Sequence, residues 1–226
     1  MTVPSLISCV VPVNDGERFI AAAIDSILAQ DHSPLEVVVV DNGSLDSSAL
    51  LAERFGEPVR VLRQEDRGPP GGRNRGIREA RGEFVAFLDA DDLYRPAKLS
   101  TQLECLSAEP ALDICLCTAE SFWEPGLEHE AARYAALGKL RGTHTFGTML
   151  ARRAVFERVG LLDETRLLDD QAEWFLRAAD AGLATRILPD VLVDRRMHAA
   201  SMSHRHDVID SYLELVAARL GRARRR

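Results

Sequence analysis

The sequence predicts an α/β protein built on a mostly parallel, doubly wound β-sheet. Over the first 92 residues, short apolar segments alternate with amphipathic segments, which is the order of strands and helices in βαβ units. Among the apolar segments, 84–88 is continuous rather than alternating, as expected for a parallel strand covered on both faces. Three of them are followed directly by polar residues, at the sheet edge where folds of this class bind ligands.

The predicted elements of the first half are joined by short connections. We expect strands at 6–11, 35–41, 59–63 and 84–88, and helices at 19–30, 47–55, 73–80 and from about 96. The segment Asp66–Gly76, DRGPPGGRNRG, predicts a loop that opens a helix, with backbone N–H groups to cradle phosphate and Arg73 to add charge. A plain turn also explains the glycines, but less easily the two arginines that flank Asn74.

The second half is less regular. We expect strands at 114–118, 147–152, 185–188 and 191–196, helices at 153–159 and 170–181, and a terminal helix from about 207. Residues 120–144 predict a long loop with one short helix, and such loops are usually functional lids or disordered. The terminal helix is apolar on one side and would dock on its own domain or form a homodimer, through Val208, Tyr212, Leu215 and Val216.

Composition limits the class of protein. The 226 residues fit one large domain, and the formal net charge of −7 argues against nucleic acid as a partner. The chain shows no signal segment and no apolar run of membrane-spanning length, which predicts a cytoplasmic protein. Five arginines lie between Arg219 and Arg226, as a solvated tail or as a peripheral contact with anionic lipid. The four cysteines lack zinc-site spacing and are expected to be reduced.

The most informative segment is Phe84–Asp92, FVAFLDADD, in which an apolar strand ends in three carboxylates within four positions. Asp89 and Asp91 would lie at the carboxyl edge of the sheet, where ligands bind. Hard oxygen ligands there suit Mg²⁺ or Mn²⁺ that holds a diphosphate, so we expect a divalent metal site. The alternative is a cap for the helix that begins near Pro96, but a cap needs one carboxylate and not three.

Six segments, in order along the chain, match the motifs of one enzyme family. They are VVPVNDGERFI at 10–20, VVVVDNGSLD at 37–46, GPPGGRNRGI at 68–77, GEFVAFLDADD at 82–92, GTMLARRAVFERVGLLDE at 147–164 and DDQAEWFLRAADAG at 169–182. Together they resemble the family 2 glycosyltransferases over nearly the whole chain. A further segment at 194–204, DRRMHAASMSH, is similar to the Arg-Arg-x-His segment that closes many members.

The resemblance implies a single GT-A domain over 1–226, with a Rossmann-like, mostly parallel sheet flanked by helices and a C-terminal acceptor-side extension. Residues 1–118 would form the nucleotide-sugar-binding half, 119–206 the acceptor and catalytic half, and 207–226 an amphipathic helix with a basic tail. The implied activity is metal-dependent, inverting transfer of a hexose-type sugar from a nucleotide-diphosphate sugar, with UDP favoured. The acceptor would be a hydroxyl or other nucleophile on a glycan, a natural product or a peptide.

The resemblance also implies the donor site, position by position. Asp41 matches an aspartate that hydrogen-bonds the pyrimidine base, Arg73 an arginine near the nucleotide, and Asp89 a carboxylate near the ribose or a metal-bound water. Asp91 is the implied direct metal ligand, and His198 matches a histidine that completes the metal or diphosphate site. The implied nucleotide site comprises Pro12, Val13, Asn14, Asp41, Gly43, Arg73, Asp89 and Ala90.

The end of the first strand departs from the family pattern. Members commonly carry Tyr-Asn where this chain has Asn14-Asp15, so the aromatic that would pack on the base is absent. Because stacking is worth about 1–3 kcal/mol per base in nucleic-acid systems, dTDP and GDP stay open beside UDP. Judged from the residues alone, His198 after two arginines is typical of an exposed histidine.

The catalytic base of an inverting transfer is a carboxylate within hydrogen-bond reach of the acceptor hydroxyl. The family supplies it from a Glu-Asp pair ahead of a tryptophan-containing helix, and the matching positions here are Asp170 and Gln171. Asp170 is the implied base, with Asp169 or Glu173 as alternatives that present an acid nearby. A purely structural interpretation makes Asp169 the helix N-cap and pairs Glu173 with Arg177.

Two rival functions stay open. A nucleotide-sugar-binding module would keep the donor site but lack the base, since Gln171 occupies its usual position. A nucleotidyltransferase shares the architecture, but would ordinarily carry a glycine-rich loop with Lys or Arg right after the first strand. This chain has Asn14, Asp15 and Gly16 there, followed only by Glu17 and Arg18.

Overall fold

The computed structural model describes residues 5–201, except 137, 139–140 and 143–144. The strands are β1 (Ile7–Val13), β2 (Leu35–Asn42), β3 (Val59–Gln64), β4 (Phe84–Phe87), β5 (Leu93–Tyr94), β6 (Ile114–Trp123), β7 (Arg141–Gly142), β8 (Met149–Arg152) and β9 (Thr185–Met197). The helices are α1 (Ile20–Leu28), α2 (Ser48–Glu53), α3 (Gly68–Glu79), α4 (Lys98–Ala108), α5 (Glu128–Ala136), α6 (Val155–Val159) and α7 (Asp170–Asp180), with a 3₁₀ helix η1 (Phe146–Thr148). Within the described residues, these strands form one sheet in the order β3-β2-β1-β4-β8-β6-β9-β5, with β7 paired to β6.

The first half forms the parallel part of the sheet, as predicted. β2 and β4 flank β1, and β3 lies outside β2. Alternate residues of β1 face two different cores: Cys9 and Val11 pack with the buried residues of α1, whereas Val10 packs with Ile77 of α3. Helices therefore cover both faces of the sheet, which is why β4 and most of β1 are apolar.

The glycine- and proline-rich segment is helical, so the loop predicted ahead of residue 73 is wrong. α3 begins at Gly68, and its prolines lie in the first turn, where a missing N–H breaks no helical hydrogen bond. The glycines serve packing: a Cβ on Gly76 would lie 2.1 Å from Cγ1 of Val10. The helix thus approaches β1 more closely than a larger side chain allows.

The second half adds antiparallel pairing to the sheet. β8 runs antiparallel to both β4 and β6, and β9 runs parallel to β6. α7 is anchored to this part by Trp174, which is fully buried, with its ring centroid 5.3 Å from that of Phe146 and 5.1 Å from that of Phe156. This aromatic cluster places the first turn of α7 beside the sheet.

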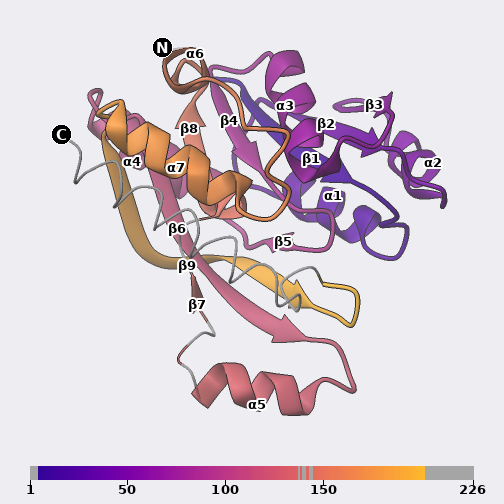
Figure 1. The fold of residues 1–226 in the computed structure, drawn as a ribbon. Helices are drawn as coiled ribbons and strands as arrows, with labels where there is room; N and C mark the ends of the chain where they lie inside the picture. Colours follow the sequence, from indigo (N-terminus) through magenta and orange to yellow (C-terminus); the bar gives the residue numbers. More distant parts are fainter. Residues whose placement is uncertain (1–4, 137, 139–140, 143–144, 202–226) are drawn as a thin grey trace.

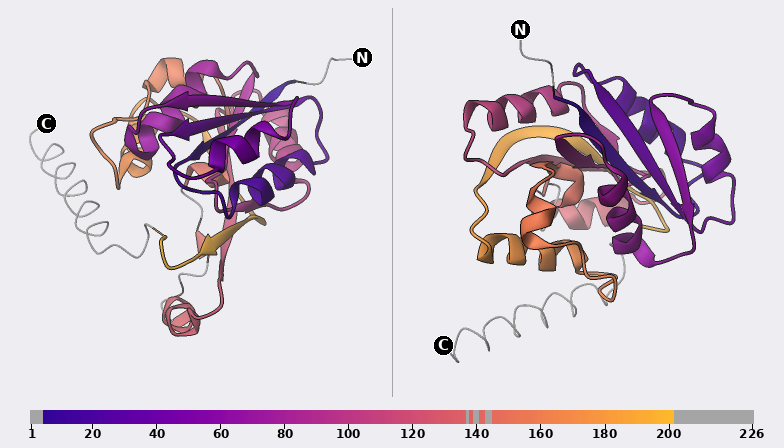
Figure 2. Two further views of the ribbon diagram at one scale, coloured as in Figure 1. Left: turned by 90° about the vertical axis from the view of Figure 1, so that its right-hand side faces the viewer. Right: turned by 90° about the horizontal axis from the view of Figure 1, so that it is seen from above.

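Two predictions for the second half are wrong. β6 continues through Trp123, so residues 120–123 belong to a strand rather than to a long loop, and α5 follows. The two strands predicted over 185–196 are one continuous strand, β9. The second half of β6 extends away from the parallel part of the sheet, with β9 alongside it and α5 beyond its end (Figure 1; Figure 2, left). Pairing with β9 satisfies the backbone of residues 120–123, which the sequence did not indicate as a strand.

The four cysteines are free, and three of them (Cys9, Cys115 and Cys117) are buried, as small hydrophobic residues would be. Among the described residues, no helix is both long enough and apolar enough to cross a membrane. The predicted terminal helix, its apolar side and the arginines after it lie outside the described residues, as does the end of the closing segment from 202.

Candidate functional site

The carboxyl ends of the parallel strands open into a cleft of about 640 Å³, a size typical of small-molecule sites. The ends of β1 and β2, the turn after β4, the end of β9 and the loop before α7 all contribute. The lining residues are Pro12, Val13, Asn14, Asp15, Gly16, Phe19, Asn42, Asp66, Gly68, Pro69, Arg73, Asp89, Ala90, Asp91, Asp92, Leu167, Leu168, Arg195, Arg196, His198, Ala200 and Ser201. The sheet edge that was predicted to collect polar residues therefore forms this cleft.

The acidic turn, residues Asp89–Asp92, joins β4 to β5. The Asp92 N–H donates to the Asp89 carbonyl (3.0 Å), and the buried Asp92 carboxylate accepts the backbone N–H of Arg196 (2.8 Å). α4 begins without a side-chain cap hydrogen bond, so the capping alternative is wrong. Burial and neighbouring carboxylates raise the pKa of Asp91 and of Asp92. This concentration of acidic groups in one turn favours a cation.

Asp91 and His198 meet in the cleft from distant parts of the chain. Asp91 Oδ2 lies 3.0 Å from His198 Nε2, and the imidazole packs against the ring of Phe19 at a centroid distance of 4.8 Å. The His198 side chain is only 12% exposed. Within the described residues, no three His, Cys, Asp or Glu side chains form a complete metal cage. Because Mg²⁺ and Mn²⁺ often use one or two protein ligands plus substrate phosphates, this pair fits a metal shared with a diphosphate.

Arg73 is buried between two carboxylates. Its Nη2 donates to Asp89 Oδ1 (2.8 Å) and its Nη1 donates to Asp170 Oδ2 (3.0 Å). Burial disfavours the charged guanidinium, but the attraction of the two carboxylates outweighs burial and raises the pKa of Arg73. Arg73 therefore links the acidic turn to the first turn of α7.

Asp170, the implied base, is buried in the first turn of α7 and is not among the residues that line the cleft. Burial raises the pKa of its carboxyl group, and the charge of Arg73 opposes this rise. A carboxylate with a raised pKa suits a general base, but in this structure the Asp170 carboxylate is engaged in an ion pair with Arg73.

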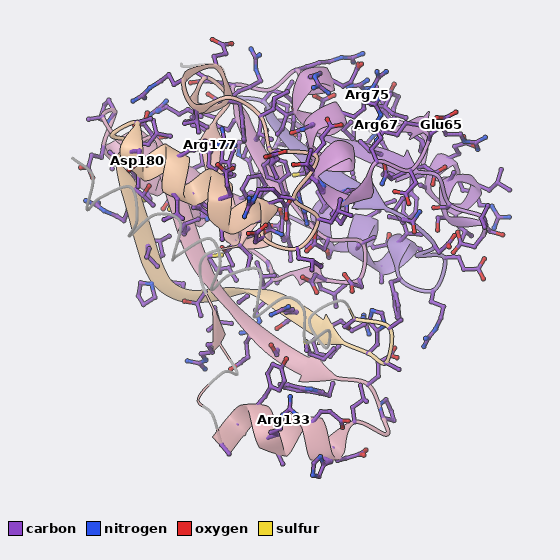
Figure 3. The ribbon with its side chains drawn as sticks, in the orientation of Figure 1. Glu65, Arg67, Arg75, Arg133, Arg177 and Asp180 are labelled. Atoms are coloured by element: carbon purple, nitrogen blue, oxygen red, sulfur yellow. The ribbon has the colours of Figure 1, made fainter. Side chains whose placement is uncertain are left out.

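The neighbouring polar side chains of α7 are held by structural contacts. Asp169 occupies the N-cap position of α7, as the structural interpretation predicted, but its carboxylate pairs with Arg166 and makes no capping hydrogen bond. Glu173 pairs with Arg177 at 2.8 Å, as the structural interpretation predicted, and Figure 3 shows Arg177 on α7. Gln171 Oε1 accepts the backbone N–H of the first η1 residue (2.7 Å). None of these side chains lines the cleft.

Of the eight predicted nucleotide-site residues, Asp41 and Gly43 do not line the cleft. Asp41 is buried and accepts the N–H of Ser44 (3.2 Å), and Gly43 has a φ of +82°, which favours glycine. Asn42, which lies between them, does line the cleft, with its amide group fixed by four hydrogen bonds. Asn42 was not predicted as a site residue, although its position at the end of β2 could have indicated that it lies at the ligand-binding edge of the sheet. The other six predicted residues line the cleft: Pro12, Val13, Asn14, Arg73, Asp89 and Ala90.

The sequence profile described as glycosyl transferase family 2 matches residues 8–161, more than half of the chain. The chain belongs to this family. An uncharacterized glycosyltransferase of Rickettsia typhi is 28% identical over 218 residues, which cover 90% of this chain and 67% of that protein. Uncharacterized glycosyltransferase YibD of Escherichia coli is 36% identical over 118 residues, 50% of this chain and 34% of that protein. This family 2 member thus spans only part of the length of these relatives.

Solved structures share the architecture of this family 2 member. Staphylococcus aureus TarS 1–349, in complex with UDP-GlcNAc, has a TM-score of 0.71 and 21% identity, covering 91% of this chain and 64% of that one. Mannosyltransferase PcManGT from Pyrobaculum calidifontis, in complex with GDP-Man and Mn²⁺, has a TM-score of 0.66 and 24% identity, covering 86% and 57%. The predicted GT-A fold is confirmed.

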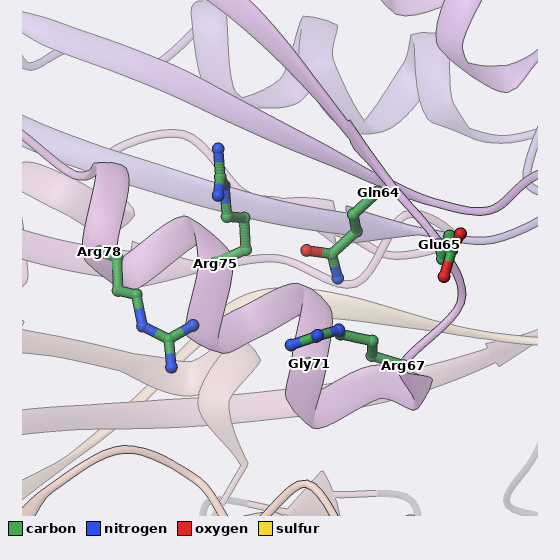
Figure 4. A pocket seen from close by; sticks show the side chains of 6 residues that line it. All are labelled: Gln64, Glu65, Arg67, Gly71, Arg75 and Arg78. Carbon is green, nitrogen blue, oxygen red and sulfur yellow. The ribbon is translucent and has the colours of Figure 1, made fainter.

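A second cavity, of about 330 Å³, lies over the surface of α3 (Figure 4). Its lining residues are Gln64, Glu65, Arg67, Gly71, Arg75 and Arg78. Glu164 pairs with both Arg67 and Arg78. Arg75 pairs with Glu79, four residues further along α3. Because carboxylates already compensate these arginines, the cavity does not compete with the cleft as the candidate site of this family 2 member.

Proposed function

We propose that this chain is an inverting, metal-dependent glycosyltransferase that moves a sugar from a nucleotide-diphosphate sugar to an acceptor nucleophile. The observation that carries the proposal is the meeting of Asp91 and His198 in a cleft that Arg73 also lines. The structural neighbours that were solved with UDP-GlcNAc and with GDP-Man and Mn²⁺ support it. A UDP-sugar is the favoured donor, with a GDP-sugar as the alternative.

Different residues of the cleft would bind different parts of the donor and its metal. Asp91 and His198 would hold Mn²⁺ or Mg²⁺, which supplies positive charge to the departing diphosphate. The first turn of α3 lines the cleft through Gly68 and Pro69, and the positive end of its helix dipole also favours a bound anion. Arg73 keeps its charge while it orients Asp89.

Asp170 is the base in this proposal. Catalytic hydrogen bonds often tighten only when substrates bind, so the present distance from the cleft does not disqualify it. Arg73 holds Asp170 and Asp89 with one guanidinium, and a shift of Arg73 toward the donor would release the Asp170 carboxylate. Asp169 and Glu173 are the alternatives, each already paired with an arginine.

A nucleotide-sugar-binding module without turnover is the second candidate. The observation that favours it is the amide at position 171, where the family usually has its base, together with its structural hydrogen bond to η1. Such a module would bind the donor and metal normally and release no nucleoside diphosphate.

The first experiment is a thermal-shift screen with UDP, GDP, CDP and dTDP, with and without Mn²⁺, because a ligand that binds only the native state raises its melting temperature. A metal-dependent rise in melting temperature with one nucleotide supports the donor site and identifies the nucleobase of the donor. No rise with any of them refutes both candidates.

Turnover then separates the two candidates. Release of that nucleoside diphosphate from its glucose, N-acetylglucosamine and mannose donors is measured for the wild type and for Asp170→Asn. An enzyme is expected to lose about 10²–10⁴-fold in rate in the variant, with donor affinity retained. A wild type that binds donor without releasing product favours the binding module.

A further inference from the structure

The acidic turn is held by a residue whose role the donor site does not explain. Arg196 lies near the end of β9, and its Nε donates to the backbone carbonyl of Asp91 (3.0 Å). Its own backbone N–H donates to the carboxylate of Asp92 (2.8 Å). One residue thus fixes both the backbone at Asp91 and the side chain at Asp92.

Two aromatic rings orient the Arg196 guanidinium. Its central carbon lies 5.1 Å from the ring centroid of Phe19 and 4.8 Å from that of Phe122. A planar guanidinium stacks on aromatic faces, which restricts its rotation and therefore the direction of its Nε–H. Phe19 precedes α1 and Phe122 belongs to β6, so the contact joins elements that are far apart in the sequence.

The same aromatic ring also supports the proposed metal ligand. Phe19 packs against the imidazole of His198, at a centroid distance of 4.8 Å. His198 is two residues from Arg196, its backbone N–H donates to Ser201 Oγ (2.9 Å), and its Nε2 meets Asp91. Phe19 therefore contacts both Arg196 and His198, the two residues from this part of the chain whose side chains meet the acidic turn.

We propose that Arg196 is a positioning residue. Its two hydrogen bonds to the acidic turn and its stacking on Phe19 and Phe122, together called the clasp, hold the turn against the end of β9. Asp91 and His198 are thereby kept at a separation that suits a divalent cation. The inference rests on the proposed function for its ligands, Mn²⁺ and a nucleoside diphosphate, but the clasp itself consists of contacts within the chain. Contacts that orient metal ligands typically change metal affinity or activity by about 10–100-fold when they are removed.

The variants separate positioning from direct phosphate binding, which is the competing explanation because Arg196 lines the cleft. Arg196→Ala removes the whole clasp, and Arg196→Lys keeps the charge without the planar group. Phe122→Leu removes one of the two aromatic rings that contact the guanidinium, and Phe122 is not among the residues that line the cleft.

The matched control is Arg186→Ala. Arg186 lies on β9, as Arg196 does, and its substitution removes only a surface ion pair with Glu109. Phe122→Leu and Arg196→Lys keep the test valid if Arg196→Ala fails to fold.

Two measurements are made on each folded variant. Hydrogen exchange of residues 89–92 is followed in metal-free protein, and binding of UDP and GDP is titrated with and without Mn²⁺. We expect Arg196→Ala and Phe122→Leu to speed exchange in the acidic turn and to weaken Mn²⁺-dependent nucleotide binding about tenfold or more. Metal-free nucleotide affinity should fall much less than Mn²⁺-dependent affinity in Arg196→Ala and should not change in Phe122→Leu. Arg196→Lys should be intermediate, and Arg186→Ala should match the wild type.

Unchanged exchange in Arg196→Ala would overturn the inference. Equal losses of nucleotide affinity with and without Mn²⁺ would also overturn it, since they indicate a direct contact with phosphate. If the wild type shows no Mn²⁺-dependent nucleotide binding, the proposed function fails instead. In that case, hydrogen exchange of residues 89–92 still tests whether Arg196 holds the acidic turn, because this measurement needs no ligand.

Discussion

At the scale of single residues, Arg73 joins the donor cleft to α7, and its environment leads to a stability prediction. Arg73→Met leaves two carboxylates uncompensated, and we expect a loss of about 3–5 kcal/mol in the free energy of unfolding. Adding Asp170→Asn should recover part of the loss, because it neutralises the more buried carboxylate. Urea unfolding of the wild type, of Arg73→Met and of the double variant measures these changes. Arg75→Met, which removes a surface pair with Glu79, is the control and should change stability by less than about 1 kcal/mol.

Asp91 gives a prediction about metal rather than stability. Asp91→Ala should abolish the Mn²⁺-dependent part of nucleotide binding, because it removes one of the two side chains that meet in the cleft. The melting temperature should change little, since a carboxylate at the cleft contributes little to the core. Calorimetric titration with Mn²⁺ and UDP or GDP checks this, with Asp25→Ala on exposed α1 surface as control. Unchanged affinity in Mn²⁺ would contradict the metal assignment.

Lys98 is buried in a way that no sequence pattern indicated. It is fully buried at the start of α4, its Nζ donates to Gln102 Oε1 (2.8 Å), and it lies 4.2 Å from the Tyr94 ring centroid. Burial lowers the pKa of Lys98 from its usual 10.5. The folded protein therefore gives up this proton at a lower pH than the unfolded chain does.

The pH dependence of stability follows from that proton. Between the lowered pKa and 10.5 the unfolded chain binds more protons, so the contribution of Lys98 to stability rises with pH. The free energy of unfolding of the wild type, relative to Lys98→Met, should rise as the pH increases toward 10.5, the usual pKa of lysine. Urea unfolding across this range measures the difference. A flat or falling difference would show that Lys98 keeps its proton in the folded protein.

At the scale of elements, the contact between α3 and β1 explains the run of glycines. Gly76→Ala should improve helix propensity by about 1 kcal/mol, yet it places a Cβ 2.1 Å from Cγ1 of Val10. We expect overpacking to prevail, with a net loss of about 1–3 kcal/mol measured by thermal unfolding. Combined with Val10→Ala, the substitution should cost less than the sum of the two single changes. Simple additivity would show that the contact does not limit the approach of α3.

Elements also differ in how well the sequence predicts them. The strands of the first half were predicted within two residues, and β1, β2 and β4 carry long apolar runs because helices cover the sheet there. The far half of β6 is only partly buried and its partner is β9, so its residues 120–123 lack that signal. α3 was shortened in the prediction because glycine and proline are poor helix formers in general, whereas its prolines occupy the first turn.

At the scale of the whole molecule, the sequence beyond the described residues gives one prediction. Five arginines at the C-terminus should attract anionic lipid, at about 1 kcal/mol each near the surface. The full chain is expected to sediment with vesicles rich in phosphatidylserine at low salt, and a chain ending at residue 206 should not. Loss of binding at high salt is the control for an electrostatic contact. Equal sedimentation of both chains would exclude the tail as the anchor.

The parallel pairing of the first four strands, the acidic turn after β4 and the family could be predicted from the sequence, because apolar segments and the residues that follow them are local signals. Which distant residues meet that turn, in contrast, depends on how the whole chain folds. His198 is 107 residues from Asp91, and Asp170 is 97 residues from Arg73. Their contacts depend on the register of β9 along β6 and on the aromatic packing of α7. Neither is encoded locally, since pairing and packing are set by the whole sheet.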